Sequence, residues 1–217
     1  MNMEYEVKIG DCRETLKTLP EKSVNCCVTS PPYFGLRSYG GGDAEFGKEE
    51  TPDAFVENLV ELFREVRRVL RDDGTVWLNL GDSYAANRTY QVPSTRGGPK
   101  HGPAQGVGGA GSSVPPGLKT KDLIGIPWRV AFALQADGWY LRQDIIWHKP
   151  NPMPESVRDR CTKAHEYIFL LSKKPKYYYD HKAIMEPAIY GAQHAAKATS
   201  WGTDRKHPNK SNVKDYA

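Results

Sequence analysis

The fold is constrained most strongly by an alternation of short apolar runs with segments of helical periodicity. The apolar runs have the length and composition of buried strands, and they are residues 6–9, 24–28, 75–80 and 139–147. An order of strand, helix, strand, helix, strand is typical of a doubly wound, mostly parallel sheet, so we predict an α/β fold. In such sheets, ligands bind at the carboxyl ends of the strands.

The expected helices begin at residues suited to that position. Asp11 begins a segment with capping-box spacing, and Thr51-Pro52-Asp53 supplies a cap, a proline and an acid to a first turn. A third helix is expected from about Ile126. At the end of the pattern, an antiparallel hairpin is expected from strands at about 166–171 and 177–179.

Charge is distributed unevenly along the 217 residues. The segment 83–121 holds five basic residues, no acidic residue and no apolar period, whereas 41–82 holds eleven acids against five bases. A long loop of this kind is usually functional or mobile. Its charge suits a polyanion, with solvated surface charge as the alternative. We therefore predict a main domain over residues 1–180 with a loop insertion at 83–121, followed by a polar region from 181 onward.

Composition excludes several classes of protein. No apolar run is long enough to cross a membrane, and the acidic N-terminus has no signal-peptide core, so a cytoplasmic protein is expected. The four cysteines, at positions 12, 26, 27 and 161, lack CxxC spacing. We therefore expect neither a metal site nor a disulfide framework.

The stretch TSPPYFGLRSYG, residues 29–40, leaves its strand through two prolines and then presents aromatic rings. One interpretation is a turn whose aromatic residues fold back onto the core. The other is a pocket for a planar base that carries an amine. The Ser30 hydroxyl and the Pro31 carbonyl can accept the amine hydrogens, the prolines stiffen the turn, and Tyr33 can stack on the base. The candidate catalytic residues are Ser30, Pro31, Pro32 and Tyr33.

The same stretch carries a family resemblance. Thr29-Ser30-Pro31-Pro32-Tyr33 resembles motif IV of the amino-group DNA methyltransferases, which use S-adenosylmethionine. The stretches GTVWLNLGDSY, DIIWHKPNPMPE and HEYIFLLSKKPKYYYD resemble the blocks that follow it, in the same order. A motif IV near the N-terminus resembles the beta group of that family. The resemblance runs from Gly10 to about Asp180 and implies a Rossmann-like methyltransferase sheet.

The resemblance also implies a substrate and a set of site residues. The substrate would be double-stranded DNA, with the target base extruded from the stack. Asp11 and Cys12 would lie beside the adenine of the cofactor, while Ser30 and Tyr33 would meet both the target base and the cofactor. The adenine branch typically has Asp where this chain has Ser30, so the N4 amine of cytosine is the expected target. The alternatives are N6-adenine methylation and, from another class, an inactive DNA-binding remnant.

Candidate DNA contacts lie in the motif turn, the basic insertion and the proline-rich loop near residue 150. They are Phe34, Arg96, Lys100, Lys149, Asn151, Arg158 and Arg160. For the last four, in the proline-rich loop, solvated surface polarity is the alternative to phosphate contact. Phe34 is included as a wall of the base pocket. The region from 181 onward is expected to begin target recognition, and a cognate restriction endonuclease is a candidate partner. The sequence does not set the oligomeric state.

One block of the beta group is absent from residues 1–217. No DPFxGxG occurs, and in the family this block supplies two central strands beside motif IV and much of the cofactor pocket. The expectation from the sequence is therefore a fragment of a longer enzyme, with an incomplete cofactor pocket.

Overall fold

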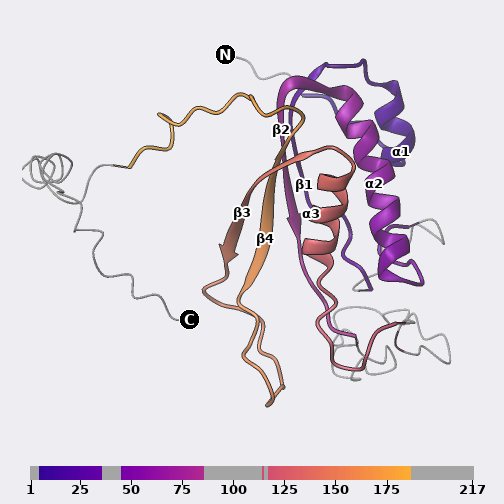
Figure 1. The fold of residues 1–217 in the computed structure, drawn as a ribbon, viewed down its shortest axis with the longest axis vertical. Helices are drawn as coiled ribbons and strands as arrows, with labels where there is room; N and C mark the ends of the chain where they lie inside the picture. Colours follow the sequence, from indigo (N-terminus) through magenta and orange to yellow (C-terminus); the bar gives the residue numbers. More distant parts are fainter. Residues whose placement is uncertain (1–4, 36–44, 86–113, 115–116, 187–217) are drawn as a thin grey trace, which may run out of the picture. The chain divides into compact units, whose positions relative to one another are not determined.

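Four strands form one sheet in the order β1-β2-β4-β3 (Figure 1). The computed structural model describes residues 5–35, 45–85, 114 and 117–186. The strands are β1 (Val24–Thr29), β2 (Leu70–Leu80), β3 (Tyr140–His148) and β4 (His165–Ser172). The helices of the described residues are α1 (Cys12–Thr15), which continues into a 3-10 turn (Leu16–Thr18), α2 (Pro52–Val69) and α3 (Ile126–Ala136).

Three of these strands point in one direction, and the fourth is reversed. β1 and β2 pair in parallel, with Val28 opposite Trp77. β4 lies between β2 and β3 and runs antiparallel to both, with Trp147 of β3 opposite Glu166. The prediction of an α/β fold is confirmed. The prediction of a mostly parallel sheet is wrong for the strand pairs of this sheet, because only the β1–β2 pair is parallel.

Two of the predicted strands are not strands in the structure. The apolar run 6–9 is exposed and has no strand partner among the described residues. The predicted hairpin partner 177–179 is irregular, and the Tyr178 N–H donates to the Asp73 carbonyl at 2.9 Å. The hairpin prediction is wrong because β4 already has a partner on each side, β2 and β3.

The predicted helix starts are confirmed. The Asp11 carboxylate caps α1 by accepting from the Arg13 N–H at 2.8 Å. The Thr51 hydroxyl accepts from the Ala54 N–H at 3.2 Å, with Pro52 in the first turn of α2. Caps of this kind satisfy amides that the helix itself cannot, and each contributes about 0.5–2 kcal/mol.

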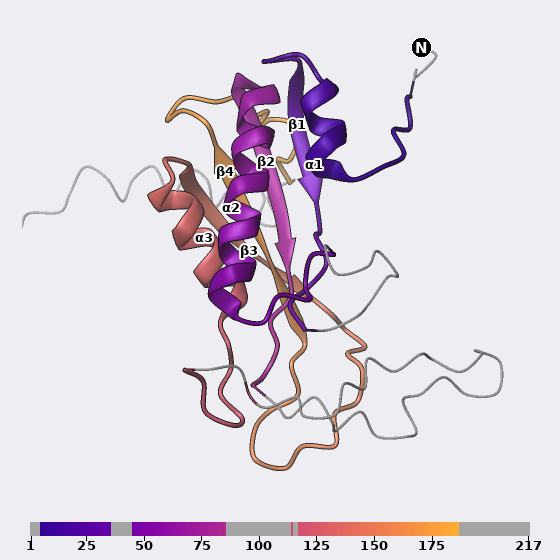
Figure 2. The same ribbon diagram turned by 90° about the vertical axis from the view of Figure 1, so that its right-hand side faces the viewer.

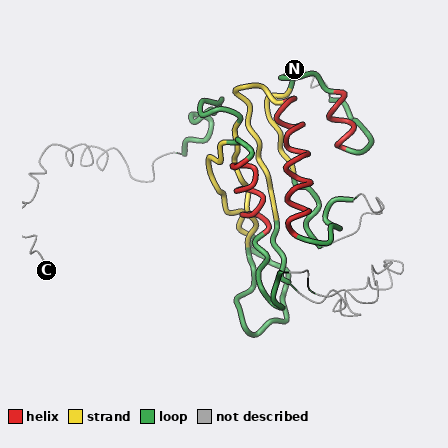
Figure 3. Tube along the Cα trace, turned by 45° about the vertical axis from the view of Figure 1, so that its right-hand side comes forward, coloured by secondary structure: helices red, strands yellow, loops and turns green. Residues whose placement is uncertain are grey.

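Helices α2 and α3 cover one face of the sheet (Figures 2 and 3). The inward face of α2 buries Phe55 and Phe63, which are at most 1% exposed. Val76 and Leu78 of β2 are fully buried in the same core. Because side chains alternate along a strand, Trp77 between them faces the other side of the sheet. That other side is where the functional site lies.

The two ends of the predicted 83–121 insertion are tied together. The Ala85 N–H donates to the Asp122 carbonyl, and the Lys121 N–H donates to the Ala85 carbonyl, both at 2.7 Å. Residues 86–113, the centre of the insertion, lie outside the described residues. These two hydrogen bonds form a neck, made of residues 85 and 121–122, at which the insertion leaves the domain.

The chain divides into two compact units, residues 1–178 and 179–217. In the second unit the Asp180 carboxylate accepts from the Lys182 and Ala183 N–H groups and closes a turn. Within the part of the chain that the structure describes, no helix combines the length and the apolar character needed to cross a membrane.

Phe55→Ala is expected to lower the free energy of unfolding by about 3–5 kcal/mol, because the ring is fully buried. Phe132→Ala is the matched control. Phe132 is 55% exposed on α3, and its loss is expected to cost less than about 1 kcal/mol. Urea unfolding followed by circular dichroism measures both variants. Equal losses would contradict the placement of the core.

Candidate active site

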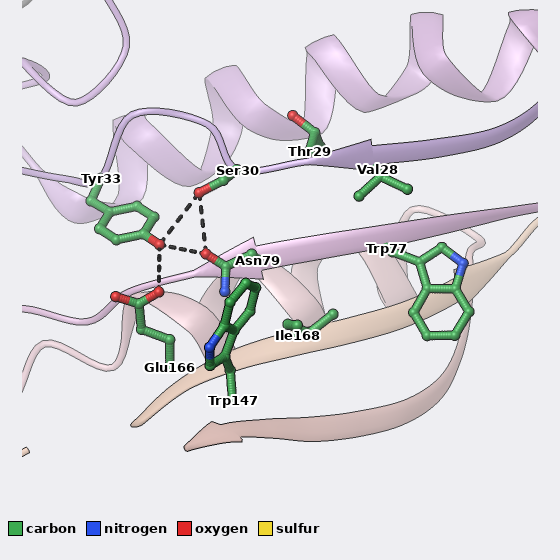
Figure 4. A pocket seen from close by; sticks show the side chains of 9 residues that line it. All are labelled: Val28, Thr29, Ser30, Tyr33, Trp77, Asn79, Trp147, Glu166 and Ile168. Carbon is green, nitrogen blue, oxygen red and sulfur yellow. Dashed lines mark hydrogen bonds between the residues drawn. The ribbon is translucent and has the colours of Figure 1, made fainter. Parts of the chain in front are cut away.

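A cavity opens on the sheet face that α2 and α3 leave uncovered, where β1 and β2 end and β4 begins (Figure 4). Its volume is about 750 Å³, within the range of small-molecule sites, about 300–1,000 Å³. Its walls come from all four strands and from the turn after β1. The lining residues are Val28, Thr29, Ser30, Tyr33, Trp77, Asn79, Trp147, Glu166 and Ile168.

The cavity has an apolar end and a polar end. Val28 and Trp77 lie toward one end, whereas Ser30, Tyr33 and Glu166 gather at the other (Figure 4). Flat apolar walls suit a planar ring, and a few convergent polar groups can fix its orientation. This arrangement is typical of a small-molecule pocket, and it lies at the carboxyl ends of β1 and β2.

The Tyr33 hydroxyl is the centre of a hydrogen-bonded cluster (Figure 4). Its oxygen lies 2.5 Å from Asn79 Oδ1, 3.0 Å from Glu166 Oε2 and 3.3 Å from Ser30 Oγ. Ser30 Oγ also lies 3.2 Å from Asn79 Oδ1. Asn79 Nδ2 donates to the Tyr167 carbonyl at 3.4 Å, which turns the amide oxygen toward the two hydroxyls. The cluster thus joins the motif turn to β2 and β4.

Glu166 enters this cluster as a charged acceptor. Lys149, at the end of β3, donates to Glu166 Oε1. Burial raises the pKa of the Glu166 carboxyl, but hydrogen bonds from Lys149 and Tyr33 outweigh that effect and leave the pKa below its ordinary value. At neutral pH the side chain is therefore a carboxylate, which can accept hydrogen bonds but not donate them.

The two aromatic residues of the motif turn face different surroundings. Phe34 folds back onto the core, where it is 2% exposed and its ring centroid lies 5.7 Å from that of Phe55. Tyr33 faces the cavity instead. Phe34 therefore does not fit the predicted DNA contact, because a ring packed in the core has no surface to offer. Pro31 is buried and Pro32 is half-buried, which leaves the turn little freedom.

Two glycines allow the backbone to approach Tyr33 closely. A Cβ at Gly81, directly after β2, would lie 2.4 Å from Tyr33 Cε2. A Cβ at Gly47 would lie 2.7 Å from the Tyr33 carbonyl oxygen, and Gly47 also has a φ of 90°. Contacts under 3.0 Å are essentially never made by real Cβ atoms. Both positions therefore require glycine while Tyr33 keeps this place.

Asp82, next to Gly81, caps a helix. Its Oδ1 accepts from the N–H groups of Ser83, Gly125 and Ile126 at 2.9, 3.0 and 3.0 Å. The last two are the residues where α3 begins. The carboxylate therefore fixes the end of β2 against the start of α3, close to the site.

The predicted cofactor residues of the N-terminal segment, Asp11 and Cys12, are exposed and do not line this cavity. Hydrogen bonds from the side chain and backbone of Arg13 lower the pKa of Asp11 to about 2. The Arg13 guanidinium lies 5.2 Å from the centroid of the Phe46 ring. Phe46 adjoins Gly47, so α1 contacts the segment that supports the motif turn.

Two of the predicted DNA contacts in the β3–β4 connection are engaged within the chain. Lys149 holds the carboxylate of the cavity. Arg160 pairs with Glu155, and its guanidinium lies 3.9 Å from the centroid of the Tyr84 ring. These cations therefore have structural partners, and a phosphate would compete with them.

The other predicted DNA contacts differ in placement. Asn151 and Arg158 are exposed on the same connection. Arg96 and Lys100 lie outside the described residues. Among the predicted DNA contacts that the structure describes, Asn151 and Arg158 are therefore the two whose residues are exposed.

Sequence reasoning did not identify Asn79, Trp147 or Glu166 as site residues. Alternation along β2 could have found Asn79, because a polar residue between two buried leucines faces the opposite side of the sheet. The pairing of Trp147 with Glu166 depends on where β4 lies in the sheet. The order of apolar runs along the chain does not contain that information.

Comparison with known proteins identifies the family. A family model described as DNA methylase matches residues 24–216. The chain belongs to this DNA methylase family. It is 54% identical over 187 residues to the Type II methyltransferase M.SmaI of Serratia marcescens, covering 84% of this chain and 61% of that protein. It is 50% identical over 198 residues to M.Cfr9I of Citrobacter freundii, covering 91% and 63%. This methylase chain thus spans about three fifths of the length of these relatives.

Solved structures share the fold at lower identity. The cytosine-N4-specific PvuII DNA methyltransferase matches with a TM-score of 0.55 and 18% identity, covering 89% of this chain and 61% of that chain. A protein of Thermus thermophilus, crystallised with S-adenosyl-L-methionine, matches with a TM-score of 0.52 and 24% identity, covering 81% and 56%. The fold is therefore that of these methyltransferase structures.

Gly81→Ala is expected to lower the free energy of unfolding by about 1–3 kcal/mol, because the new Cβ overlaps the Tyr33 ring. In a Tyr33→Ala background the same change is expected to cost less than about 0.5 kcal/mol. Gly74→Ala is the control, because its Cβ would meet Leu70 Cγ at 2.7 Å in either background. Urea unfolding of each variant provides the comparison. A Gly81→Ala cost that persists without the ring would contradict the contact.

Proposed function

We propose that the chain carries the catalytic part of a Type II DNA methyltransferase that transfers a methyl group from S-adenosyl-L-methionine to the N4 amine of cytosine. The observation that carries the proposal is the uncharged Ser30 hydroxyl, hydrogen-bonded to Tyr33 and Asn79 at the polar end of a cavity with flat apolar walls. Relatives that are half identical to this chain are Type II methyltransferases.

Ser30 and Pro31 activate the amine. The lone pair of an exocyclic amine is delocalised into the ring, which makes the nitrogen a poor nucleophile. A hydroxyl oxygen and a backbone carbonyl that accept its two hydrogens draw the nitrogen toward tetrahedral geometry and free the lone pair. The Ser30 hydrogen has acceptors inside the cluster, so its oxygen can accept from the amine. The two prolines set the direction of the carbonyl before the substrate arrives.

The target base reaches the cavity after it has left the duplex, since an amine inside the stack is inaccessible. Tyr33 stacks on the extruded base. Double-stranded DNA is held through its phosphates by the exposed Asn151 and Arg158 and by Arg96 and Lys100 of the insertion. The region from 181 onward begins target recognition, and a cognate restriction endonuclease is the expected biological partner.

Four residues are assigned to the cofactor by the resemblance, and the carboxylate of one of them, Asp11, already accepts hydrogen bonds from Arg13, with which the cofactor would compete. S-adenosyl-L-methionine supplies, when bound, an electrophilic methyl group carried on a sulfonium sulfur. Asp11, ionised at neutral pH and solvent-accessible, can accept a hydrogen bond from the adenine amine of the cofactor, with Cys12 next to it. Ser30 and Tyr33 meet the methionine end. Charge and exposure at Asp11 support this assignment.

A second candidate target is the N6 amine of adenine, which members of the same family methylate. The resemblance favours cytosine, because the adenine branch typically carries Asp at the position of Ser30. An inactive DNA-binding remnant is the candidate from another class. The hydrogen-bonded cluster around Tyr33 argues against it, because such a remnant has no need to keep Ser30, Asn79 and Glu166 in register.

The product is expected to be N4-methylcytosine. The complete gene is expressed in a host without methylases, its DNA is digested to nucleosides, and the modified base is identified by mass spectrometry. Ser30→Ala is expected to slow methylation about tenfold or more, the factor that corresponds to about 1.4 kcal/mol of lost transition-state interaction. Ser23→Ala, at a hydroxyl that bonds the Pro20 carbonyl outside the site, is the control. N6-methyladenine without methylated cytosine would contradict the assignment.

Tyr33→Ala is expected to slow methyl transfer more than Tyr33→Phe does, because only the alanine variant loses the ring. The difference between the two is expected to correspond to about 1–3 kcal/mol, the usual contribution of an aromatic residue that stacks on a base. Initial rates with duplex DNA provide the measurement. Equal rates for the two variants would mean that the hydroxyl, and not stacking, accounts for the role of Tyr33.

A further inference from the structure

The acid at the start of β4 is bonded directly to the aromatic residue of the motif turn. Glu166 Oε2 lies 3.0 Å from the Tyr33 hydroxyl, although the two residues are 133 positions apart. The other carboxylate oxygen, Oε1, is held by Lys149 at the end of β3. The Glu166 carboxylate therefore lies between two partners, the Lys149 ammonium directly after β3 and the Tyr33 hydroxyl in the turn after β1. These two bonds restrict its side chain.

Glu166 is also the one charged residue among those that line the described cavity. A carboxylate only accepts hydrogen bonds, so it directs the single hydrogen of the Tyr33 hydroxyl toward itself or toward Asn79. The Tyr33 oxygen can then accept from Ser30. A glutamine of the same shape would bring donor hydrogens to this place and compete for the Tyr33 oxygen.

The hydroxyl lies at the far end of the ring from the backbone, so a bond there sets the tilt of the ring. The ring is already pressed against the backbone at Gly81, where a Cβ would lie 2.4 Å from it. Contact at the edge and a bond at the tip together hold the face of Tyr33 in one orientation. Reacting groups misplaced by about 1 Å can cost a hundredfold in rate, so this orientation matters for catalysis.

We infer that Glu166, anchored by Lys149, is a positioning residue of the methyl-transfer site: it holds the Tyr33 hydroxyl so that the ring and Ser30 meet the target base in one geometry. The inference rests on the proposed function, and it extends the site from the motif turn to β4. It requires that Glu166 act through the hydroxyl of Tyr33.

The experiment is a double-mutant cycle on methyl transfer to duplex DNA, using protein expressed from the complete gene. Glu166→Gln is expected to lower kcat roughly ten- to hundredfold, the usual effect of losing a hydrogen bond to a charged group. The KM values for DNA and for S-adenosyl-L-methionine are expected to stay near those of the wild type. In a Tyr33→Phe background, Glu166→Gln is expected to cause no further loss, because the hydroxyl through which it acts is gone.

Glu65→Gln on α2 is the matched control, because Glu65 is also a half-buried acid, paired with Arg68 at 2.9 Å. Its kcat is expected to equal that of the wild type. If Glu166→Gln does not fold, Glu166→Asp replaces it, since the shorter carboxylate keeps the charge but does not reach Tyr33. The same disappearance of its effect in the Tyr33→Phe background is expected.

A wild-type kcat in Glu166→Gln would overturn the inference, as would a loss of the same size with and without the Tyr33 hydroxyl. A loss confined to KM would also overturn it, because a positioning role acts on the chemical step. A wild-type protein that methylates neither cytosine nor adenine would overturn the proposed function itself. The two failures are therefore distinguishable.

Discussion

The site depends on the direction of one strand. β4 runs against β2 and β3, so it begins at the edge of the sheet where the other strands end. Glu166, the second residue of β4, therefore lies at the same end of the sheet as Tyr33 and bonds its hydroxyl. In a parallel orientation Glu166 would lie at the opposite edge, about 20 Å away at the usual rise per residue. The cavity would then keep its aromatic walls but lose the Glu166 carboxylate.

Adjacent side chains of the motif turn connect this cavity to the core. Phe34 packs on Phe55 of α2, while Tyr33, one residue earlier, faces the cavity. Burial of Phe34 against α2 stabilises the turn from one side of the sheet, and Tyr33 of the same turn lines the cavity on the other side. The packing of Phe34 restricts the turn before a ligand arrives, which lowers the cost of binding.

The sequence predicted the local features well, because they depend on neighbouring residues. The cap at Thr51 and the strand predicted over 24–28, which the structure places at Val24–Thr29, both follow from short patterns. The reversed β4 was not predicted, since strand order is a property of the whole sheet. Glu166 was missed for the same reason. The run 6–9 has the composition of a strand, but a strand also needs a partner to bond with.

The neck at Ala85 and Asp122 affects how far the insertion can vary in evolution. Hydrogen bonds at the neck fix the distance between the two ends of the insertion, whatever lies between them. Doubling the length of a closed loop costs only about 0.6 kcal/mol of chain entropy. In evolution, insertions of different length or sequence can therefore replace one another between residues 85 and 121. The residues of the cavity can stay the same while the surface that binds other molecules changes.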